Sequence, residues 1–300
     1  MFYKLRKSLA AKRFYRLTRD ILDTPPMPVV PAPFSLVSMV SNNDVQMYLL
    51  SMKSCYRQIG RGKLVAIIDR DMPAKSRELL AHHFPGIEFQ ILEDIDVGPC
   101  QRGGTWERVI FLIKRSEHEY AIQVDCDTLS FGSDLNEVLE CIRDNRAFTL
   151  SGGEHKIVSM AQAAANARKI DHSYIGLALE ARFDEYPGFQ NLRNVRGSSG
   201  FAGFSKGGFS VSRLEEFHGV VQRWFPDRYK EWGTEQSASN FAIANSTGAI
   251  VLPHPKYANF EPETDTSNSS FLHFIGTHRF ERDVFANAGK KLINELSAAS

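Results

Sequence analysis

Short apolar runs alternate with helical segments between residues 34 and 124, and this alternation constrains the fold more than any other feature. Helices of about 10–15 residues between strands are typical of right-handed βαβ units on a parallel sheet. We therefore expect a single Rossmann-like α/β domain with a mostly parallel central sheet. The expected strands are Phe34–Val40, Lys63–Ile68, Ile87–Leu92 and Tyr120–Val124. The expected helices between them are Asp44–Gln58, Ala74–Phe84 and Trp106–Lys114.

The second half of the chain is less regular. Residues Gly197–Gly208 are rich in glycine, which favours either a loop closing over a site or a tight turn between edge strands. The spacing of these glycines matches neither a P-loop nor a dinucleotide-binding motif. A short strand is predicted at Phe209–Val211. Further helices are predicted at Leu135–Arg143, Leu214–Trp224, Glu235–Asn245 and Arg282–Leu296.

Residues 1–20 carry seven lysines and arginines against one acid, interleaved with aromatic residues and leucines. Such a basic helix either lies on an anionic membrane surface or packs one side on the domain with the other side solvated. The proline-rich stretch from Thr24 to Pro33 ends this helix and acts as a stiff linker. We therefore divide the chain into a helix and linker at 1–33 and a main domain at 34–300.

Overall composition excludes several classes of protein. The net charge is +1 and the body of the chain has no basic stripe, so a nucleic-acid partner is not expected. The four cysteines lack paired spacing and are interpreted as buried thiols in a reducing compartment. No apolar run approaches the roughly 20 residues of a membrane span, and no signal peptide is expected. The predicted location is the cytoplasm.

Three Asp-x-Asp tripeptides occur, at Asp69–Asp71, Asp94–Asp96 and Asp125–Asp127. The third directly follows the apolar run Tyr120–Val124, which places two carboxylates at the carboxyl end of a strand, where open α/β sheets bind ligands. Neighbouring carboxylates repel one another unless a cation lies between them. Oxygen ligands suit Mg²⁺ or Mn²⁺, which also take phosphate oxygens. This pair is therefore the candidate metal site.

Simpler roles exist for these acids. Asp125 and Asp127 can cap the following turn. Asp94–Asp96 lies in a polar loop and is interpreted as solvated. Asp69 also ends a predicted strand, where it is either a helix N-cap before Pro73 or a contact to a bound donor.

The residues around the third pair resemble the donor-site core of glycosyltransferase family 8 and related GT-A enzymes. The matching stretches are Thr105–Arg108, Tyr120–Asp127 and Asp134–Leu135. The resemblance implies a GT-A fold in which Asp125 and Asp127 bind a metal on the donor diphosphate. It also implies that Arg108 forms a salt bridge with the acidic pair and contacts the donor sugar.

A second motif agrees in order and spacing. The family has Asp-Gln and then Asn on a helix beside the reacting sugar, and this chain has Glu235-Gln236 and then Asn240. The resemblance implies catalytic positions for Gln236 and Glu235 and a donor contact for Asn240. Thr234 also has the character of a helix N-cap, and a glutamate in a first helical turn is favoured by the helix dipole alone.

The third motif is His273-Phe-Ile-Gly276-Thr-His-Arg279, which resembles the family's His-x-x-Gly-x-x-Lys with arginine in place of lysine. The resemblance implies that His273 is the third metal ligand, that Gly276 lets the backbone approach the diphosphate, and that Arg279 neutralises it. A guanidinium can bind phosphate in a bidentate fork. Imidazole with two carboxylates favours Mn²⁺ over Mg²⁺. A histidine in an apolar run is otherwise a hydrogen-bonded core residue, and Arg279 a solvated one.

The expected function is metal-dependent transfer of a sugar from a nucleotide-diphosphate sugar, foremost a UDP-sugar, to a glycan, lipid-linked or other hydroxyl acceptor. The family resemblance implies retention of configuration. One alternative is a haloacid-dehalogenase-type phosphohydrolase, but Thr128 comes one residue too early for it and the acidic pair is not on the first strand. Another is a non-catalytic protein that binds membranes or partners through residues 1–20, which leaves the three ordered motifs unexplained.

Overall fold

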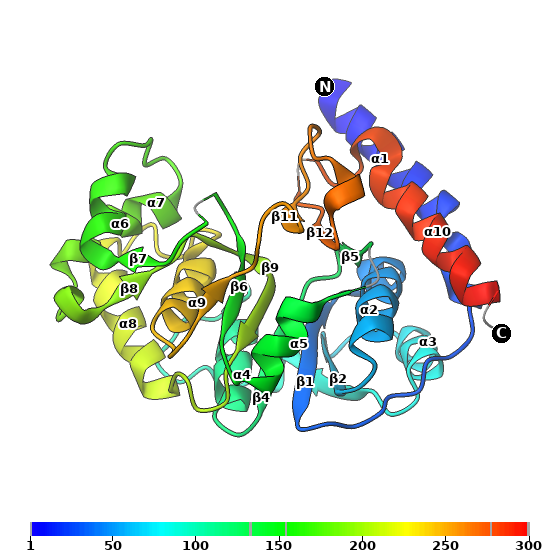
Figure 1. Cartoon of the computed structure of the whole chain (residues 1–300), viewed down its shortest axis with the longest axis horizontal. Helices are drawn as coiled ribbons and strands as arrows, with labels where there is room; N and C mark the ends of the chain where they lie inside the picture. The colour runs from blue at the N-terminus through cyan, green and yellow to red at the C-terminus, as the bar shows by residue number, and fades with distance from the viewer. Residues whose placement is uncertain (1, 132–133, 154, 277, 299–300) are drawn as a thin grey trace. The chain divides into compact units, whose positions relative to one another are not determined.

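The computed structural model describes residues 2–131, 134–153, 155–276 and 278–298. It has a mixed α/β fold in which seven strands form a largely parallel central sheet, as expected from the sequence (Figure 1). The chain divides into two compact units, each described by itself below. Unit 1 comprises Met1–Ile91, Val124–Asn136 and His254–Ser300, and unit 2 comprises Leu92–Gln123 and Glu137–Pro253.

Three parallel strands of the central sheet belong to unit 1, in the order β1-β2-β3. Strands β1 (Phe34–Val40) and β2 (Lys63–Ile68) are almost entirely buried, and both agree with the predicted bounds. Strand β3 (Glu88–Ile91) is shorter and partly exposed. The helices that follow β1 and β2 are α2 (Val45–Ile59) and α3 (Ala74–His83). Glycine 60 ends α2 in the left-handed conformation, which glycine adopts without steric cost.

A second, three-stranded sheet in unit 1 brings distant parts of the sequence together. Its strands are β5 (Thr128–Ser130), β11 (Tyr257–Asn259) and β12 (Phe271–His273), in the order β11-β12-β5. His273 pairs with Thr128 on one side and with Asn259 on the other. The small sheet therefore places β12 beside the segment that follows the acidic pair.

The N-terminal helix α1 (Phe2–Leu17) lies alongside α10 (Val284–Ala298) in unit 1 (Figure 1). Phe14 is buried, and its ring lies 5.1 Å from that of Phe280 and 4.6 Å from that of Phe285. Phe285 in turn stacks on Phe274 with ring centroids 4.3 Å apart. One side of the helix thus packs on the domain. The exposed basic residues of the helix are Arg6, Lys7, Lys12, Arg13 and Arg16, and Arg19 follows just after it.

Two buried basic residues hold the chain between Leu22 and Pro25, after this helix. The Lys53 ammonium donates to Thr24 Oγ1 at 2.9 Å and to the Pro25 carbonyl at 2.6 Å. His83 Nε2 lies 3.2 Å from the Leu22 carbonyl. Burial lowers the pKa of His83 to about 4, with Lys53 adding to the effect, and burial lowers the pKa of Lys53 to about 8. Both groups therefore take up protons less readily than in water.

Unit 2 holds the strands in the order β10-β6-β9-β4. These are β4 (Tyr120–Val124, whose last residue begins a segment of unit 1), β6 (Phe148–Ser151), β9 (Gly197–Phe204) and β10 (Ile250–Val251). Strands β7 (Val158–Ser159) and β8 (Arg193–Asn194) form a separate pair. The helices are α4 (Trp106–Ser116), α5 (Asn136–Arg143), α6 (Met160–Ala167), α7 (Ile175–Glu180), α8 (Val211–Trp224) and α9 (Thr234–Ala244).

Two sequence predictions are wrong in this unit. Most of the glycine-rich segment is not a loop or a turn, because Gly197–Phe204 forms the fully buried strand β9; only residues 205–208, after the strand, form a turn. Its glycines permit close packing: a Cβ at Gly203 would lie 2.3 Å from the Phe148 ring. The predicted strand Phe209–Val211 is also absent, since α8 begins at Val211. Ser210 caps that helix by accepting from the Arg213 amide at 3.4 Å.

Within the described part of the chain, no helix combines the length and apolar character needed to cross a bilayer.

Candidate metal centre

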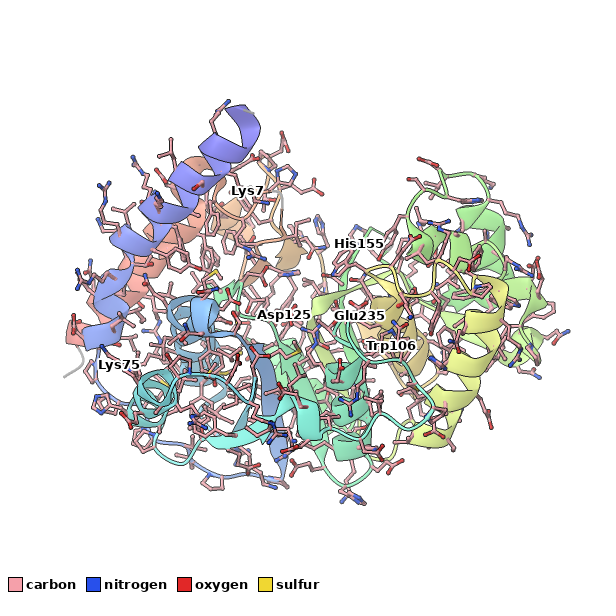
Figure 2. All side chains as sticks on the ribbon, turned by 180° about the vertical axis from the view of Figure 1, so that it is seen from behind. Lys7, Lys75, Trp106, Asp125, His155 and Glu235 are labelled. Carbon is pink, nitrogen blue, oxygen red and sulfur yellow. The ribbon has the colours of Figure 1, made fainter. Side chains whose placement is uncertain are left out.

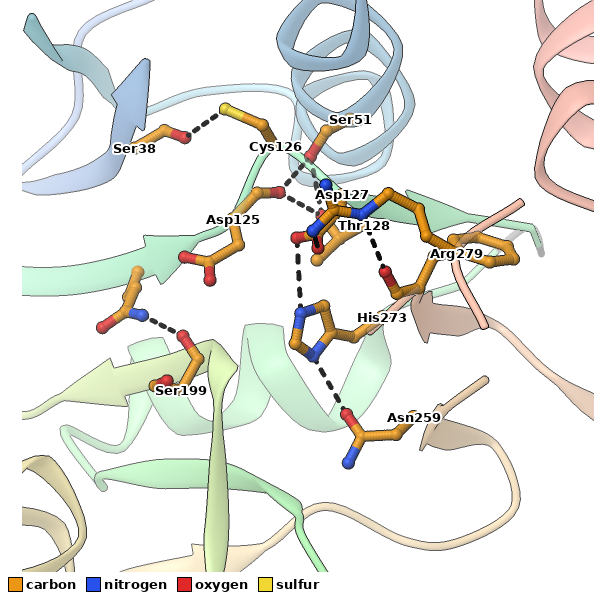
Figure 3. Close-up of polar contacts among 12 residues, drawn as sticks. Ser38, Ser51, Asp125, Cys126, Asp127, Thr128, Ser199, Asn259, His273 and Arg279 are labelled. Carbon is orange, nitrogen blue, oxygen red and sulfur yellow. Dashed lines mark hydrogen bonds and ion pairs between the residues drawn. The ribbon is translucent and has the colours of Figure 1, made fainter. Parts of the chain in front are cut away.

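Asp125, Asp127 and His273 come together in unit 1, with one ligand atom from each residue lying within 4.8 Å of the others (Figure 3). The acidic pair occupies the turn between β4 and β5, and His273 is the last residue of β12. Because β12 pairs with β5, the imidazole is delivered to the turn that carries the two carboxylates. The sequence placed these three residues in one site, and the fold brings them together.

Hydrogen bonds fix the backbone of this turn. The Asp125 carbonyl accepts from Ser51 Oγ at 2.9 Å and from Thr128 Oγ1 at 2.8 Å. The thiol of Cys126 donates to the Met39 carbonyl at 3.1 Å, and its side chain points away from the two carboxylates (Figure 3). The alternation of side chains around Cys126 thus leaves both carboxylates on the side of the turn near His273.

Asp127 is buried between two basic groups. Its Oδ1 lies 3.3 Å from His273 Nε2, and its Oδ2 accepts from the Arg279 guanidinium. Burial by itself raises the pKa of Asp127, but His273 and Arg279 outweigh it and lower the pKa to about 2. A buried anion held in this way requires positive charge beside it.

The orientation of His273 is set by Asn259, which the sequence did not point to. His273 Nδ1 lies 3.0 Å from Asn259 Oδ1, and an amide oxygen only accepts, so Nδ1 carries the proton. Nε2 faces Asp127: the charged imidazole donates from Nε2 to the carboxylate, whereas the neutral form keeps its proton on Nδ1 and has its lone pair on Nε2. Burial lowers the pKa of His273, but Asp127 and then Asp125 outweigh it, so the pKa is raised. This is the arrangement by which metal-binding histidines are oriented in proteins.

Arg279 belongs to the segment after β12. Its Nε donates to the Phe274 carbonyl at 3.3 Å, while Nη2 reaches Asp127. The structure therefore places Arg279 directly on the carboxylate of Asp127. Gly276 is exposed, and a Cβ there would have no neighbouring atom within 4 Å. The diphosphate contacts inferred for Gly276 and Arg279 stay predictions.

Arg108 and Glu235 belong to unit 2 and interact with each other. Both are buried, at 6% and 2% exposure, and Arg108 acts to lower the pKa of Glu235. Burial is the larger effect, so the pKa of Glu235 is raised overall. The sequence assigned Arg108 to Asp125 and Asp127, and that assignment stays a prediction.

The start of α9 is fixed by local contacts. Trp106 Nε1 donates to Thr234 Oγ1 at 3.0 Å. Thr234 directly precedes Glu235, so this contact holds Trp106 beside the first turn of α9, where Figure 2 labels both Trp106 and Glu235. Glu235 accepts from the Gly233 amide at 3.0 Å. Gly233, in the left-handed conformation, is the N-cap, so the interpretation of Thr234 as the cap is wrong. A left-handed cap suits glycine because it has no Cβ.

The remaining predicted residues have structural partners. Gln236 Oε1 accepts from Ser199 Oγ at 3.2 Å. Asn240 is buried and donates to the Gly197 carbonyl at 3.3 Å, which ties α9 to β9. In unit 1, Asp69 lies at the end of β2, but the N-cap of α3 is Pro73, so the cap interpretation of Asp69 is wrong. Catalytic or donor contacts of these residues stay predictions.

No protein-family model and no curated protein sequence matches this chain. Among solved structures, the chain is similar to the galactosyltransferase LgtC in complex with donor and acceptor sugar analogs, with a TM-score of 0.46 at 12% identity, covering 88% of this chain and 95% of LgtC. It is also similar to core-mannan synthase A from Aspergillus fumigatus in its Mn/GDP form, with a TM-score of 0.45 at 12% identity, covering 86% and 84%.

The chain is similar, too, to the apo structure of the bifunctional glycosyltransferase WbbM, with a TM-score of 0.52 at 14% identity. This match covers 88% of the chain but only 49% of WbbM, so the chain spans about half the length of that enzyme. At this identity the likeness concerns the fold. The chain therefore has the fold of a GT-A glycosyltransferase, as its sequence motifs suggested.

Proposed function

We propose that this protein is a metal-dependent glycosyltransferase that moves a sugar from a nucleotide-diphosphate sugar to an acceptor hydroxyl. The observation that carries the proposal is the convergence of Asp125, Asp127 and His273 within 4.8 Å, in a chain with a glycosyltransferase fold. The same fold gives no support to the phosphohydrolase alternative. UDP-sugars are the first donors to test, and retention of configuration is the expected stereochemical outcome.

The residues present fit a divalent cation. Two carboxylates and one imidazole are oxygen and nitrogen ligands that suit Mn²⁺. Asn259 already fixes the proton on Nδ1 of His273, which leaves Nε2 to bind the ion. When bound, the ion would neutralise the charge that develops on the departing nucleoside diphosphate.

Arg279 has a second role in this proposal. Its guanidinium supplies the positive charge beside Asp127 in the structure described above. A cation bound by Asp127 would compete with that contact, and the released guanidinium can bind phosphate oxygens in a bidentate fork. Open space at Gly276, three residues earlier, leaves room for a phosphate against the backbone. Metal and diphosphate binding are thereby linked through one side chain.

In unit 2, Gln236 and Glu235 are proposed to contact the reacting sugars. Ser199 donates to the oxygen of the Gln236 amide, which orients its NH₂ group as a donor. Glu235 is held by the Gly233 amide and by the charge of Arg108. These contacts would hold both side chains in place before a substrate arrives, which lowers the entropic cost of reaction.

The exposed basic side of α1 is proposed to contact anionic membrane without insertion. Six exposed arginines and lysines of the N-terminal segment belong to the described residues. Each basic residue near a charged bilayer contributes about 1 kcal/mol, so binding would be reversible and sensitive to salt. A location at the membrane surface suits a lipid-linked or surface-glycan acceptor.

Thermal unfolding with UDP and Mn²⁺ tests the proposed function. A ligand that binds only the native state stabilises it by about 2.7 kcal/mol at a concentration of 100 times Kd. We expect UDP to raise the melting temperature of the wild type only when Mn²⁺ is present. Asp127→Asn should lose this response, whereas Asp71→Asn, at an exposed aspartate of another Asp-x-Asp in the same unit, should keep it.

The proposal fails if neither UDP nor GDP stabilises the wild type in a Mn²⁺-dependent manner. It also fails if Asp127→Asn responds like the wild type. Circular dichroism of each variant before the titration establishes that a lost response does not come from unfolding.

A further inference from the structure

Trp232 is the most exposed large apolar side chain among the described residues, with 66% of its surface accessible. The other two tryptophans differ, since Trp106 is fully buried and Trp224 is half-buried. An exposed tryptophan adds nothing to a core, and large exposed aromatic surfaces mark binding sites. The question is which ligand this ring would bind.

The ring forms an aromatic pair with Tyr174 in unit 2. Its centroid lies 6.0 Å from that of Tyr174, with the planes inclined by 45°. Two glycines make room for Tyr174: a Cβ at Gly233 would lie 2.1 Å from its hydroxyl, and a Cβ at Gly176 would lie 2.5 Å from its ring. Gly233 also has a φ of +104°, which side-chain-bearing residues rarely adopt.

Arg228 ties together the two segments that carry the pair. It donates to the Ser173 carbonyl at 2.7 Å and forms an ion pair with Glu231 at 2.8 Å. One segment ends at Tyr174 and the other at Trp232, so a single guanidinium holds both. The pair is therefore positioned before any ligand arrives, which reduces the entropic cost of binding.

The pair adjoins the residues proposed to contact the reacting sugars. Trp232 is three positions before Glu235, and the chain between them is fixed by the Trp106–Thr234 hydrogen bond. Tyr174 is close enough to Glu235 for the two to interact: burial, and then Glu235, raises the pKa of Tyr174 to about 12. The Trp232–Tyr174 pair thus lies at the N-terminus of α9.

We propose that Trp232 and Tyr174 form an acceptor subsite on which a saccharide ring stacks. This inference rests on the proposed function and names the substrate class, an acceptor that presents a sugar. One face of a pyranose is a patch of C–H groups that packs on an aromatic ring, while its hydroxyls need hydrogen-bonding partners around the rim. Charged side chains close to the pair in sequence can supply these hydrogen-bonding partners. The exposed or half-buried ones are Asp171, Arg228, Lys230 and Glu231.

The polar surroundings argue against an acyl chain or an apolar protein surface as the occupant. Either would remove Asp171, Lys230 and the Arg228–Glu231 ion pair from water, which costs free energy. A saccharide instead offers both donors and acceptors to them.

The test uses the full-length protein with lactose, cellobiose and N-acetylglucosamine as probes. Saturation-transfer NMR measures their binding, and acrylamide quenching of tryptophan fluorescence measures the protection of Trp232. We expect at least one probe to bind and to protect the exposed tryptophan. Trp232→Ala should weaken its binding about tenfold, as expected for the loss of roughly 1.4 kcal/mol of stacking, and Trp232→Phe should restore part of it.

Ile170→Ala is the matched control, because Ile170 is 44% exposed in the same unit. It should bind the probe like the wild type. UDP–Mn²⁺ binding is measured on the same samples. If the wild type binds UDP–Mn²⁺ but no probe protects Trp232, or if Trp232→Ala binds probes like Ile170→Ala, the subsite is refuted and the proposed function stands. If the wild type binds neither UDP nor, in a parallel measurement, GDP in the presence of Mn²⁺, the proposed function itself is refuted.

Discussion

Replacing Asn259 with leucine tests whether this residue orients His273 for metal binding. Leucine has the same number and branching of side-chain heavy atoms but removes the oxygen that lies 3.0 Å from His273 Nδ1. The ring nitrogen then loses its acceptor in a buried position, and nothing holds the imidazole in the tautomer that leaves Nε2 available. We expect metal affinity to fall while the fold persists.

The size of the effect follows from the contact. Losing a partner inside a protein costs about 1–3 kcal/mol, and outer partners of metal-binding histidines affect affinity about 10–100-fold. These two ranges agree, because a tenfold change in affinity equals about 1.4 kcal/mol. Asn259→Leu should therefore raise the Kd for Mn²⁺ by about 10–100-fold. Asn259→Asp keeps an acceptor oxygen, so this variant should bind Mn²⁺ at least tenfold more tightly than the leucine variant.

Isothermal titration with Mn²⁺ in the presence of saturating UDP measures these constants. Asn287→Leu, at an exposed position of α10 in the same unit, controls for the introduction of leucine. A Mn²⁺ titration of Asn259→Leu that coincides with that of the wild type would falsify the role assigned to Asn259.

Three further predictions follow from other contacts. Arg279→Ala should weaken UDP binding yet leave Mn²⁺ binding without nucleotide unchanged or tighter, because the guanidinium no longer competes for Asp127; calorimetry showing weaker Mn²⁺ binding would contradict this. The pKa of His83 is about 4 in the folded state and 6.5 in the unfolded state, so the unfolded state takes up a proton first as the pH drops. The free energy of unfolding should therefore fall by about 2–3 kcal/mol between pH 7 and pH 4.5. Urea unfolding should show a smaller pH-dependent loss of unfolding free energy in His83→Gln than in the wild type. Equal losses in the two proteins would exclude His83 as the cause. Finally, the charge-reversal variant R6E/K7E/K12E in α1 should no longer float with anionic liposomes at low salt. Flotation of the wild type that persists at high salt would argue against an electrostatic contact.

The sequence predicted those parts of the structure that depend on local pattern. Strands β1, β2 and β4 are apolar runs bounded by polar residues, and their ends were predicted correctly. Asp125 and Asp127 were predictable because they directly follow one of these runs. His273 was predictable only through its spacing to Gly276 and Arg279 in a motif that resembles a known family.

Features that depend on distant contacts could not be predicted. Asn259 meets His273 because β11 pairs with β12 in one particular register, and no local pattern encodes that register. The glycines of β9 favoured a loop or a tight turn in the sequence, because the reason for a glycine such as Gly203 is the side chain of Phe148 on the neighbouring strand. The charge of Arg279 was evident from the sequence, whereas its contact with Asp127 depends on how the chain turns after β12.

The aromatic contacts of α1 connect the first twenty residues to the segment that carries His273 and Arg279. Phe14 supports Phe280, the neighbour of Arg279, and reaches Phe274, the neighbour of His273, through Phe285. The helix therefore supports the segment that carries His273 and Arg279. Trimming the protein at the linker would withdraw that support, so shortened forms and bulky N-terminal fusions are expected to bind Mn²⁺ differently from the whole chain.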